Sequence, residues 1–257
     1  MRVTVATQTH QAVSTKFEMP VGRWNTNKRI FMKKDFNKKF GFTLSEVLIT
    51  LGIVGIVAAL TIPAIMKNYK NRLYVSELKK VYSQLTNATS SIMSDEHAQN
   101  FYETTGGVKD SCTSTDSEDC KGSAYFLANY FKSMKQNCIN GDGQCVAAAY
   151  HSTKGKSANE FNSSYCIQTV NGAAICMFFD TKSNTSKIIV DVNGTSEPNI
   201  TGRDVYVMQV ASDGSITDIS SDEDDCNAPD DNSPIIDLAK GCLTKVMNAG
   251  WKIEDDE

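Results

Sequence analysis

The sequence contains few of the residues and patterns from which enzymes and metal centres are usually built. Its three histidines, His10, His97 and His151, are scattered over 257 residues, and it has no Cys-x-x-Cys pair. This spacing argues against a zinc site. The patterns G-x-S-x-G, G-x-x-x-x-G-K and H-E-x-x-H are also missing. We therefore expect a protein that is not an enzyme and has no cofactor.

Proline is scarce as well, with five residues, and glycine accounts for only 16. Together with 40% hydrophobic and 22% charged residues, this composition excludes wholesale disorder and a collagen-like rod. The length fits one or two folded units.

Acidic residues are almost missing from the beginning of the chain. Residues 1–41 contain nine basic and two acidic side chains, which leaves 17 basic and 28 acidic ones, a net charge of −11, for residues 42–257. Phosphate backbones repel such an acidic head, and no local basic run offsets this, so no nucleic acid is expected as a partner. All eight cysteines lie in the later part. Export of the later part alone would explain both asymmetries.

A run of 25 residues from Phe42 to Met66 is apolar except for Glu46. As a helix it would be roughly 37 Å long, enough to cross a bilayer core of about 30 Å. The run is longer than the apolar core of a cleavable secretory signal. Lys33, Lys34, Lys38 and Lys39 precede it and should keep the N-terminus in the cytoplasm. We expect a single-pass inner-membrane protein with its head outside.

Glu46 is unusual within an apolar run, because inserting an acid near the centre of a span costs about 2.5–3.5 kcal/mol. Either Glu46 reaches water at the membrane boundary, or it pairs with a cation near the start of the run. Cleavage between Gly41 and Phe42 would create such a cation, since an α-amine is largely protonated at neutral pH.

The stretch from Lys38 to Leu48, KKFGFTLSEVL, with the apolar run after it, resembles the prepilin cleavage and methylation signature of the type IV pilin superfamily. That superfamily includes pilus subunits and the pseudopilins of competence and type II secretion systems. The resemblance covers only about residues 33–66. It implies that prepilin peptidase cuts after Gly41 and N-methylates Phe42, and that Glu46 then pairs with the methylated amine, on a neighbouring subunit. Pro63 would mark a stretch that melts or bends when subunits leave the bilayer.

The leader, residues 1–41, is long for such a signature. Met32 begins a basic stretch of ordinary leader length, MKKDFNKKFG. We therefore expect translation to start at Met32.

The helix is expected to continue beyond the apolar run. Apolar residues recur every three or four positions over residues 67–94, at Tyr74, Leu78, Val81, Leu85, Ala88 and Ile92. One helix from Phe42 to Ser94 is thus predicted, with a membrane-spanning and assembly half (42–66) and an amphipathic half (67–94). A separate anchor followed by a second helix would give the same pattern.

Residues 95–257 are predicted to form a globular head. A short helix is expected with Tyr125, Phe126, Tyr130, Phe131 and Met134 as its apolar positions. Period-two patterns then predict four or five antiparallel strands, beginning with a hairpin whose two-residue loop is Asn171-Gly172. A last helix is expected over 234–248. The fold class is therefore α+β, with the long helix packed on a small sheet.

The eight cysteines predict a disulfide-rich head, although eight thiols allow 105 pairings. Three candidate pairs would close short loops or tie the acidic tail to the last helix: Cys112 with Cys120, Cys138 with Cys145, and Cys226 with Cys242. Cys166 and Cys176 flank the hairpin, but a two-residue loop would place residue 167 opposite Cys176, so this pair needs a different register.

Oxygen-bearing side chains surround the loop after the third predicted strand, at Asp191, Asn193 and Asp204. They either form a calcium site or hydrogen-bond their own backbone in a turn, and the twelve-residue calcium loop pattern is not present. Some secretion pseudopilins bind calcium in a loop of comparable location.

The pattern as a whole indicates a structural subunit of a type IV pilus or pseudopilus, which ends in an extracellular or periplasmic filament. Its expected partners are the membrane, prepilin peptidase, the filament assembly machinery, and copies of itself and other pilins. A minor pseudopilin of a type II secretion or competence system is one alternative. A membrane-anchored binding domain that never polymerises is another.

Overall fold

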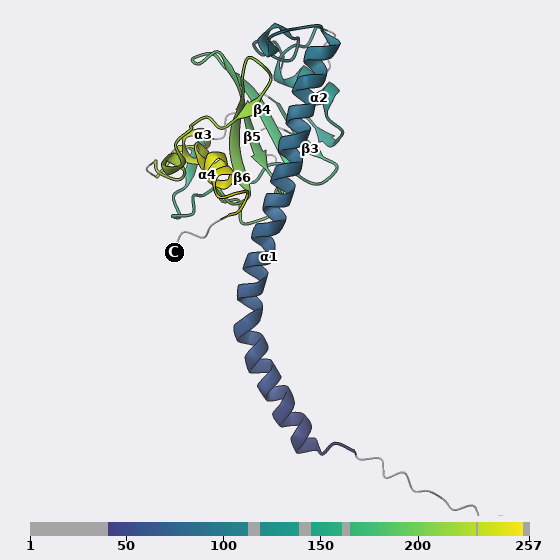
Figure 1. The fold of residues 1–257 in the computed structure, drawn as a ribbon, viewed down its shortest axis with the longest axis vertical. Helices are drawn as coiled ribbons and strands as arrows, with labels where there is room; N and C mark the ends of the chain where they lie inside the picture. The colour runs from purple at the N-terminus through teal and green to yellow at the C-terminus, as the bar shows by residue number, and fades with distance from the viewer. Residues whose placement is uncertain (1–40, 113–118, 139–144, 161–164, 230, 254–257) are drawn as a thin grey trace, which may run out of the picture. The chain divides into compact units, whose positions relative to one another are not determined.

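The computed structural model describes residues 41–112, 119–138, 145–160, 165–229 and 231–253 (Figure 1). The chain divides between Leu51 and Gly52 into two compact units. Helix α1 (Leu44–Asp95) is a single helix of 52 residues that includes this division. The prediction of one long helix from Phe42 to Ser94 is thus confirmed, with the observed ends one or two residues away from the expected ones.

Helix α1 ends at a local stop signal. His97 has a left-handed φ of 52° and donates its N–H to the Ser94 carbonyl at 3.3 Å. The Ala98 N–H bonds to the Met93 carbonyl at 2.9 Å. These two bonds satisfy carbonyls that a helix end would otherwise leave unpaired. One of the three histidines therefore has a structural position, as the residue just past the helix.

The head contains a six-stranded antiparallel sheet. Its order is β1-β3-β4-β5-β6-β7, formed by β1 (Ser133–Gln136), β3 (Tyr165–Thr169), β4 (Ala174–Asp180), β5 (Thr185–Asp191), β6 (Val205–Val210) and β7 (Ile216–Thr217). A two-stranded parallel sheet joins β2 (Ala158–Glu160) to β8 (Ser233–Pro234). The antiparallel α+β architecture was predicted.

The prediction of four or five strands was too low by one edge strand. Helix α2 (Ser123–Tyr130) ends before Met134, which lies in β1 with its side chain 68% exposed. The expected short helix therefore extended too far. Strand β1 was not predicted because its sequence, Ser-Met-Lys-Gln, has no apolar alternation. As an edge strand, β1 pairs with the sheet on one side only.

The β3–β4 hairpin has a longer loop than expected. Cys166 lies opposite Cys176 and Gln168 opposite Ala174. The Gly172 N–H bonds to the Thr169 carbonyl, and Gly172 has a φ of 93°. A loop of three residues with a left-handed glycine replaces the two-residue Asn-Gly turn. The longer loop shifts the register so that the two cysteines face each other.

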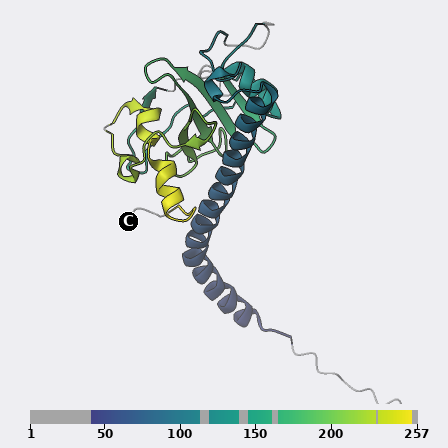
Figure 2. The ribbon, with the colours of Figure 1, turned by 45° about the horizontal axis from the view of Figure 1, so that its top comes forward.

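The sheet has a covered face on each side, as the alternation of β4 shows. Ile175 and Met177 belong to the core that includes α1, whereas Ala174 and Cys176 belong to the core on the opposite face. Helix α1 contributes one stripe of buried side chains to the first core, and these are Tyr74, Val75, Leu78, Val81, Leu85, Ala88 and Ile92. Figure 1 and Figure 2 both show α1 running along the sheet.

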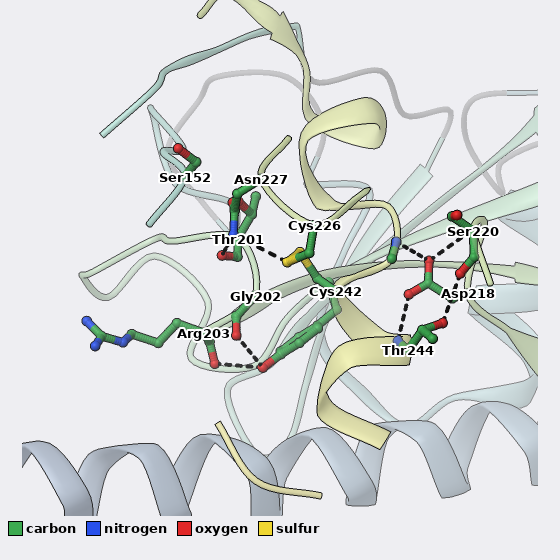
Figure 3. The surroundings of a disulfide bond; sticks show 12 residues. Ser152, Thr201, Gly202, Arg203, Asp218, Ser220, Cys226, Asn227, Cys242 and Thr244 are labelled. Carbon is green, nitrogen blue, oxygen red and sulfur yellow. Dashed lines mark hydrogen bonds between the residues drawn. A yellow bond between two sulfur atoms is a disulfide. The ribbon is translucent and has the colours of Figure 1, made fainter. Parts of the chain in front are cut away.

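The last predicted helix is two short helices, α3 (Ile235–Ala239) and α4 (Cys242–Asn248). They part at Gly241, which has a left-handed φ of 78° and begins α4. Asp218 accepts hydrogen bonds from the N–H groups of Gly241 at 2.8 Å and Thr244 at 2.9 Å (Figure 3). A carboxylate just after β7 therefore fixes the start of α4. No local sequence pattern predicts this long-range contact.

All eight cysteines form disulfides, and none is free. The pairs are those considered from the sequence: Cys112–Cys120, Cys138–Cys145, Cys166–Cys176 and Cys226–Cys242. The disulfide-rich head is thus confirmed.

Candidate processing and assembly segment

The Gly41–Phe42 bond precedes the first residue of α1 by two positions. Both residues are exposed, and the Phe42 side chain is 87% exposed. A Cβ built on Gly41 would meet no atom within 4 Å. In the single chain Gly41 and Phe42 therefore lie exposed, just before the helix begins.

Thr43 and Glu46 form a capping box at the start of α1. The Glu46 N–H donates to Thr43 Oγ1 at 3.2 Å, and the Thr43 N–H donates back to Glu46 Oε2 at 2.8 Å. The Thr43 hydroxyl also donates to Oε2, at 2.8 Å. This reciprocal pair satisfies two backbone donors that a helix start leaves unpaired. The sequence signal for this capping box is Thr-x-x-Glu before an apolar run.

The apolar run exposes its side chains in the single chain. Its most apolar 18-residue window, with a mean hydropathy of 2.4, is 0% buried and meets the length and composition of a membrane span. Leu44 is 80% and Leu60 76% exposed. Surfaces of this extent need lipid or other protein to cover them. Among the residues that the structure describes, α1 is therefore the one helix long and apolar enough to cross a membrane.

Hydroxyl groups inside the run bond to the helix itself. Thr50 Oγ1 donates to the carbonyls of Glu46 at 2.8 Å and Val47 at 3.0 Å, and Thr61 Oγ1 donates to the Val57 carbonyl at 3.0 Å. Such bonds remove the cost of placing a hydroxyl in lipid or in an apolar contact.

Pro63 lies inside α1, which the structure shows as an uninterrupted helix. Proline removes a backbone donor and crowds the preceding turn. A Cβ built on Gly52 or Gly55 would meet nothing within 4 Å, so neither glycine is needed for a close contact in the single chain. Local melting or bending at Pro63 on assembly stays a prediction.

The candidate calcium residues bond to their own loop. Asp204 accepts the N–H groups of Asn199 at 2.8 Å and Ile200 at 2.6 Å, and Asp191 accepts the Asn193 N–H at 3.2 Å. Asp191 also accepts the hydroxyl of Tyr150 at 3.1 Å. In the described part of the chain, no three His, Cys, Asp or Glu side chains are grouped as a metal site would need.

Burial makes these two carboxyl groups weaker acids than usual. Asp191 is 2% and Asp204 0% exposed. Burial, with the neighbouring Asp204 charge as a second cause, raises the pKa of Asp191 well above its ordinary value. Burial likewise raises the pKa of Asp204, against the opposing effect of its backbone hydrogen bonds. The pair is a buried polar network that fixes the loop between β5 and β6.

His151 is a loop residue of the head. Its Nδ1 lies 3.2 Å from Ser157 Oγ, and its backbone bridges to Ser157 and Ile200. These contacts join two loops.

Taken together, an exposed apolar helix start, a continuous α1 and a disulfide-linked antiparallel head define a type IV pilin-like architecture. A family model described as the prokaryotic N-terminal methylation motif matches residues 36–62. This motif is the prepilin signature of type IV pilins and pseudopilins, and the chain carries it. A search of curated proteins and a search of solved structures found no match to the chain.

Proposed function

We propose that the chain is a structural subunit of a type IV pilus or related pseudopilus. In this proposal prepilin peptidase cuts after Gly41 and methylates the new amine of Phe42. The observation that carries the proposal is the methylation motif over residues 36–62, in which this junction lies. The exposure of Gly41 and Phe42 in the single chain supports cleavage at this bond.

Glu46 would act twice in this scheme. Both hydrogen bonds from Thr43 use one carboxylate oxygen, Oε2. The other oxygen can accept a hydrogen bond from the methylated amine of Phe42 on a neighbouring subunit. Such a pair would offset the cost of placing the carboxylate among apolar helices.

The exposed apolar run supports polymerisation for a physical reason. Moving it out of a bilayer is favourable only where neighbouring helices replace the lipid contacts. Copies of the same run, side by side, would provide that replacement. The head would stay outside the membrane and then on the filament surface, and the assembly machinery would transfer each subunit.

The first test is the chemistry of the N-terminus. Intact-mass and N-terminal analysis of the chain, isolated from cells that contain a prepilin peptidase, should find methyl-phenylalanine derived from Phe42. Substitution of Gly41 by alanine should leave the precursor uncut. A non-polymerising anchored receptor would keep the Gly41–Phe42 bond intact, and that result would overturn the proposal.

The second test separates the two roles of Glu46. Glu46→Gln retains a side-chain oxygen that can accept the Thr43 N–H, so the start of the helix is preserved, but its charge is lost. We expect cleavage to proceed while filament yield falls sharply. Thr50→Ser is the matched control on the same exposed turns and should assemble normally. Filaments at normal yield from Glu46→Gln would refute the charge pairing.

A further inference from the structure

A groove of about 440 Å³ lies beside α1 in the second unit. Its apolar walls come from Val75 of α1 and from Trp251 and Ile253, which follow α4. Arg72 and Lys252 are the charged residues that line it, and both are exposed. We call this site the Trp251 groove.

The Trp251 ring is held in place by the elements around it. It meets the Tyr82 ring of α1 edge to face, with the ring centroids 5.6 Å apart. Lys79 Nζ lies 5.4 Å from the centroid of the same ring. The Trp251 N–H donates to the Val246 carbonyl at 2.8 Å. The aromatic wall of the groove is therefore formed before any partner binds.

The two cations of the groove have no counter-charge in the described part of the chain. Neither the Arg72 side chain nor the Lys252 side chain makes a hydrogen bond or an ion pair with another described residue. The groove therefore offers two uncompensated positive charges beside an apolar wall.

A run of four acids, Asp222 to Asp225, lies at the 3₁₀ helix η2 (Glu223–Asp225). The first three of these acids are exposed. Asp222 accepts the Asp224 N–H at 3.0 Å, and Glu223 accepts the Asn248 amide at 2.7 Å. Both donors are neutral, so these bonds fix the carboxylates without compensating their charge. We call this segment the acidic run.

The acidic run and the Trp251 groove contact different elements. The acidic run bonds to Asn248 of α4, whereas Trp251 packs on Tyr82 of α1. Among the described residues, no ion pair joins the acidic run to Arg72 or Lys252. Each surface therefore lacks its opposite charge within one chain.

The net charge of the chain makes such surfaces important when copies pack together. Residues 42–257 carry a net charge of −11. Packed helices lie about 8–10 Å apart, and the Debye length at physiological ionic strength is about 8 Å. Neighbouring heads of equal charge therefore repel one another unless surfaces of opposite sign meet.

We propose that the Trp251 groove of one copy binds the acidic run of a neighbouring copy. The inference rests on the proposed function and names a contact between heads in the same filament. Each copy would use two different surfaces, so the contact repeats from copy to copy without closing a ring, as a filament requires. Because hydrogen bonds already fix the carboxylates at η2, little ordering is needed on binding.

The competing occupant of the groove is the end of the same chain. Four acids, residues 254–257, directly follow Ile253, which lines the groove. The experiment therefore includes a variant in which all four are replaced by their amides. This variant should form filaments at the wild-type yield.

The test is a charge exchange in the full chain, made in cells that process and assemble it. The groove variant, Arg72→Glu with Lys252→Glu, should lower filament yield at least about fivefold, the effect of losing two exposed ion pairs. The acidic-run variant, Glu223→Lys with Asp224→Lys, should lower it equally. The variant with all four substitutions has the net charge of the wild type and should regain the wild-type yield.

A mismatched exchange is the control for net charge. It combines Glu223→Lys and Asp224→Lys with Lys132→Glu and Lys182→Glu, two exposed lysines that do not line the groove. Its net charge is also that of the wild type, but its yield should stay low. Every variant should still be cut after Gly41.

Cross-linking of wild-type filaments identifies the contact directly. A carbodiimide joins a carboxylate to an amine as an amide and takes up the water released. Peptides that join Lys252 to Glu223 or Asp224 should occur in the dimer band of a denaturing gel and not in the monomer band.

Three results would overturn the inference. The groove variant could assemble at the wild-type yield, or the mismatched exchange could restore the yield as well as the matched one. A loss of yield in the tail-amide variant equal to that of the groove variant would identify the chain's own end as the occupant. An uncut Gly41–Phe42 bond in the wild type, by contrast, would contradict the proposed function and, with it, the inference.

Discussion

Thr43 and Glu46 hydrogen-bond to each other in both directions at the first turn of α1, with N···O distances of 3.2 and 2.8 Å. The acid that carries the proposed assembly role therefore also supports the local fold. Substitution by alanine would remove both roles at once. Substitution by glutamine removes only the charge, which is why it is the more informative change.

Thr43→Ala should weaken the start of α1 without altering charge. It removes the acceptor for the Glu46 N–H and the hydroxyl that donates to Glu46. We expect amide hydrogen exchange at residues 45–47 to be about fivefold faster in the detergent-solubilised chain, as for the loss of a typical cap. Thr43→Ser keeps the hydroxyl and should exchange at the wild-type rate. Equal protection in the alanine variant would show that the capping box adds no stability.

Thr89→Val should loosen the attachment of α1 to the turn between β6 and β7. The buried Thr89 hydroxyl donates to the Gly214 carbonyl at 2.7 Å. Valine has nearly the same shape but leaves that carbonyl unsatisfied, at a cost of about 1–3 kcal/mol in the free energy of unfolding. Urea unfolding followed by Trp251 fluorescence measures the loss. Ser90→Ala is the neighbouring control, because the exposed Ser90 hydroxyl bonds only within α1, and it should cost little.

Asp191→Asn should change how stability depends on pH. Burial and the Asp204 charge raise the pKa of Asp191 in the folded chain above its unfolded value of about 3.8. The charged form is therefore disfavoured by folding, and wild-type stability gains as the pH falls through the raised pKa, until the pH is below the unfolded value. Asparagine does not titrate, and its amide can replace the bonds to Asn193 and Tyr150.

The measurement for Asp191 is the difference in free energy of unfolding, wild type minus Asp191→Asn, from urea titrations between about pH 7 and pH 4. This difference should rise on acidification. Asp213→Asn is a control of opposite sign, since bonds from Ser215 lower the pKa of Asp213. A difference independent of pH would contradict the assigned shift of Asp191.

The disulfides should differ in their effect on the head. Replacing Cys226 and Cys242 together by alanine opens a link with a sequence separation of 16, for which loop entropy alone gives about 3 kcal/mol. Cys242 is also fully buried beside Leu243 and Val246, so its loss adds a cavity. The Cys112–Cys120 pair has a separation of 8 and a Cys112 that is only partly buried, and its removal should cost less. Equal changes in the melting temperature of the two double variants would contradict this order.

The long helix and the central strands were predictable because their periodicity is strong. The stripe from Tyr74 to Ile92 matches the buried face of α1, and the apolar strands β4 to β6 are among the strands that the period-two patterns predicted. These patterns are visible in the sequence because each element buries one face, which requires apolar residues at regular spacing.

Other features depend on contacts between distant residues, and local patterns do not record those. The split between α3 and α4 follows from Gly241 and from its bond to Asp218, 23 residues away. The predicted two-residue loop of the first hairpin was wrong because the Asn-Gly signal is local, whereas the register pairs Cys166 with Cys176. A pocket beside the Cys226–Cys242 disulfide was not predicted for the same reason, since only the fold brings Arg203 and Lys252 into its lining.

The separation of buried and exposed side chains along α1 has a practical consequence. Every buried side chain described in α1 comes after Lys67, beginning with Asn71, and none of those described in the preceding apolar stretch is buried. An expression fragment starting at Lys67 would keep the whole buried interface together with the four disulfides. Such a fragment would lack the apolar stretch for which detergent is needed. The head would then be convenient for crystallisation and for raising antibodies.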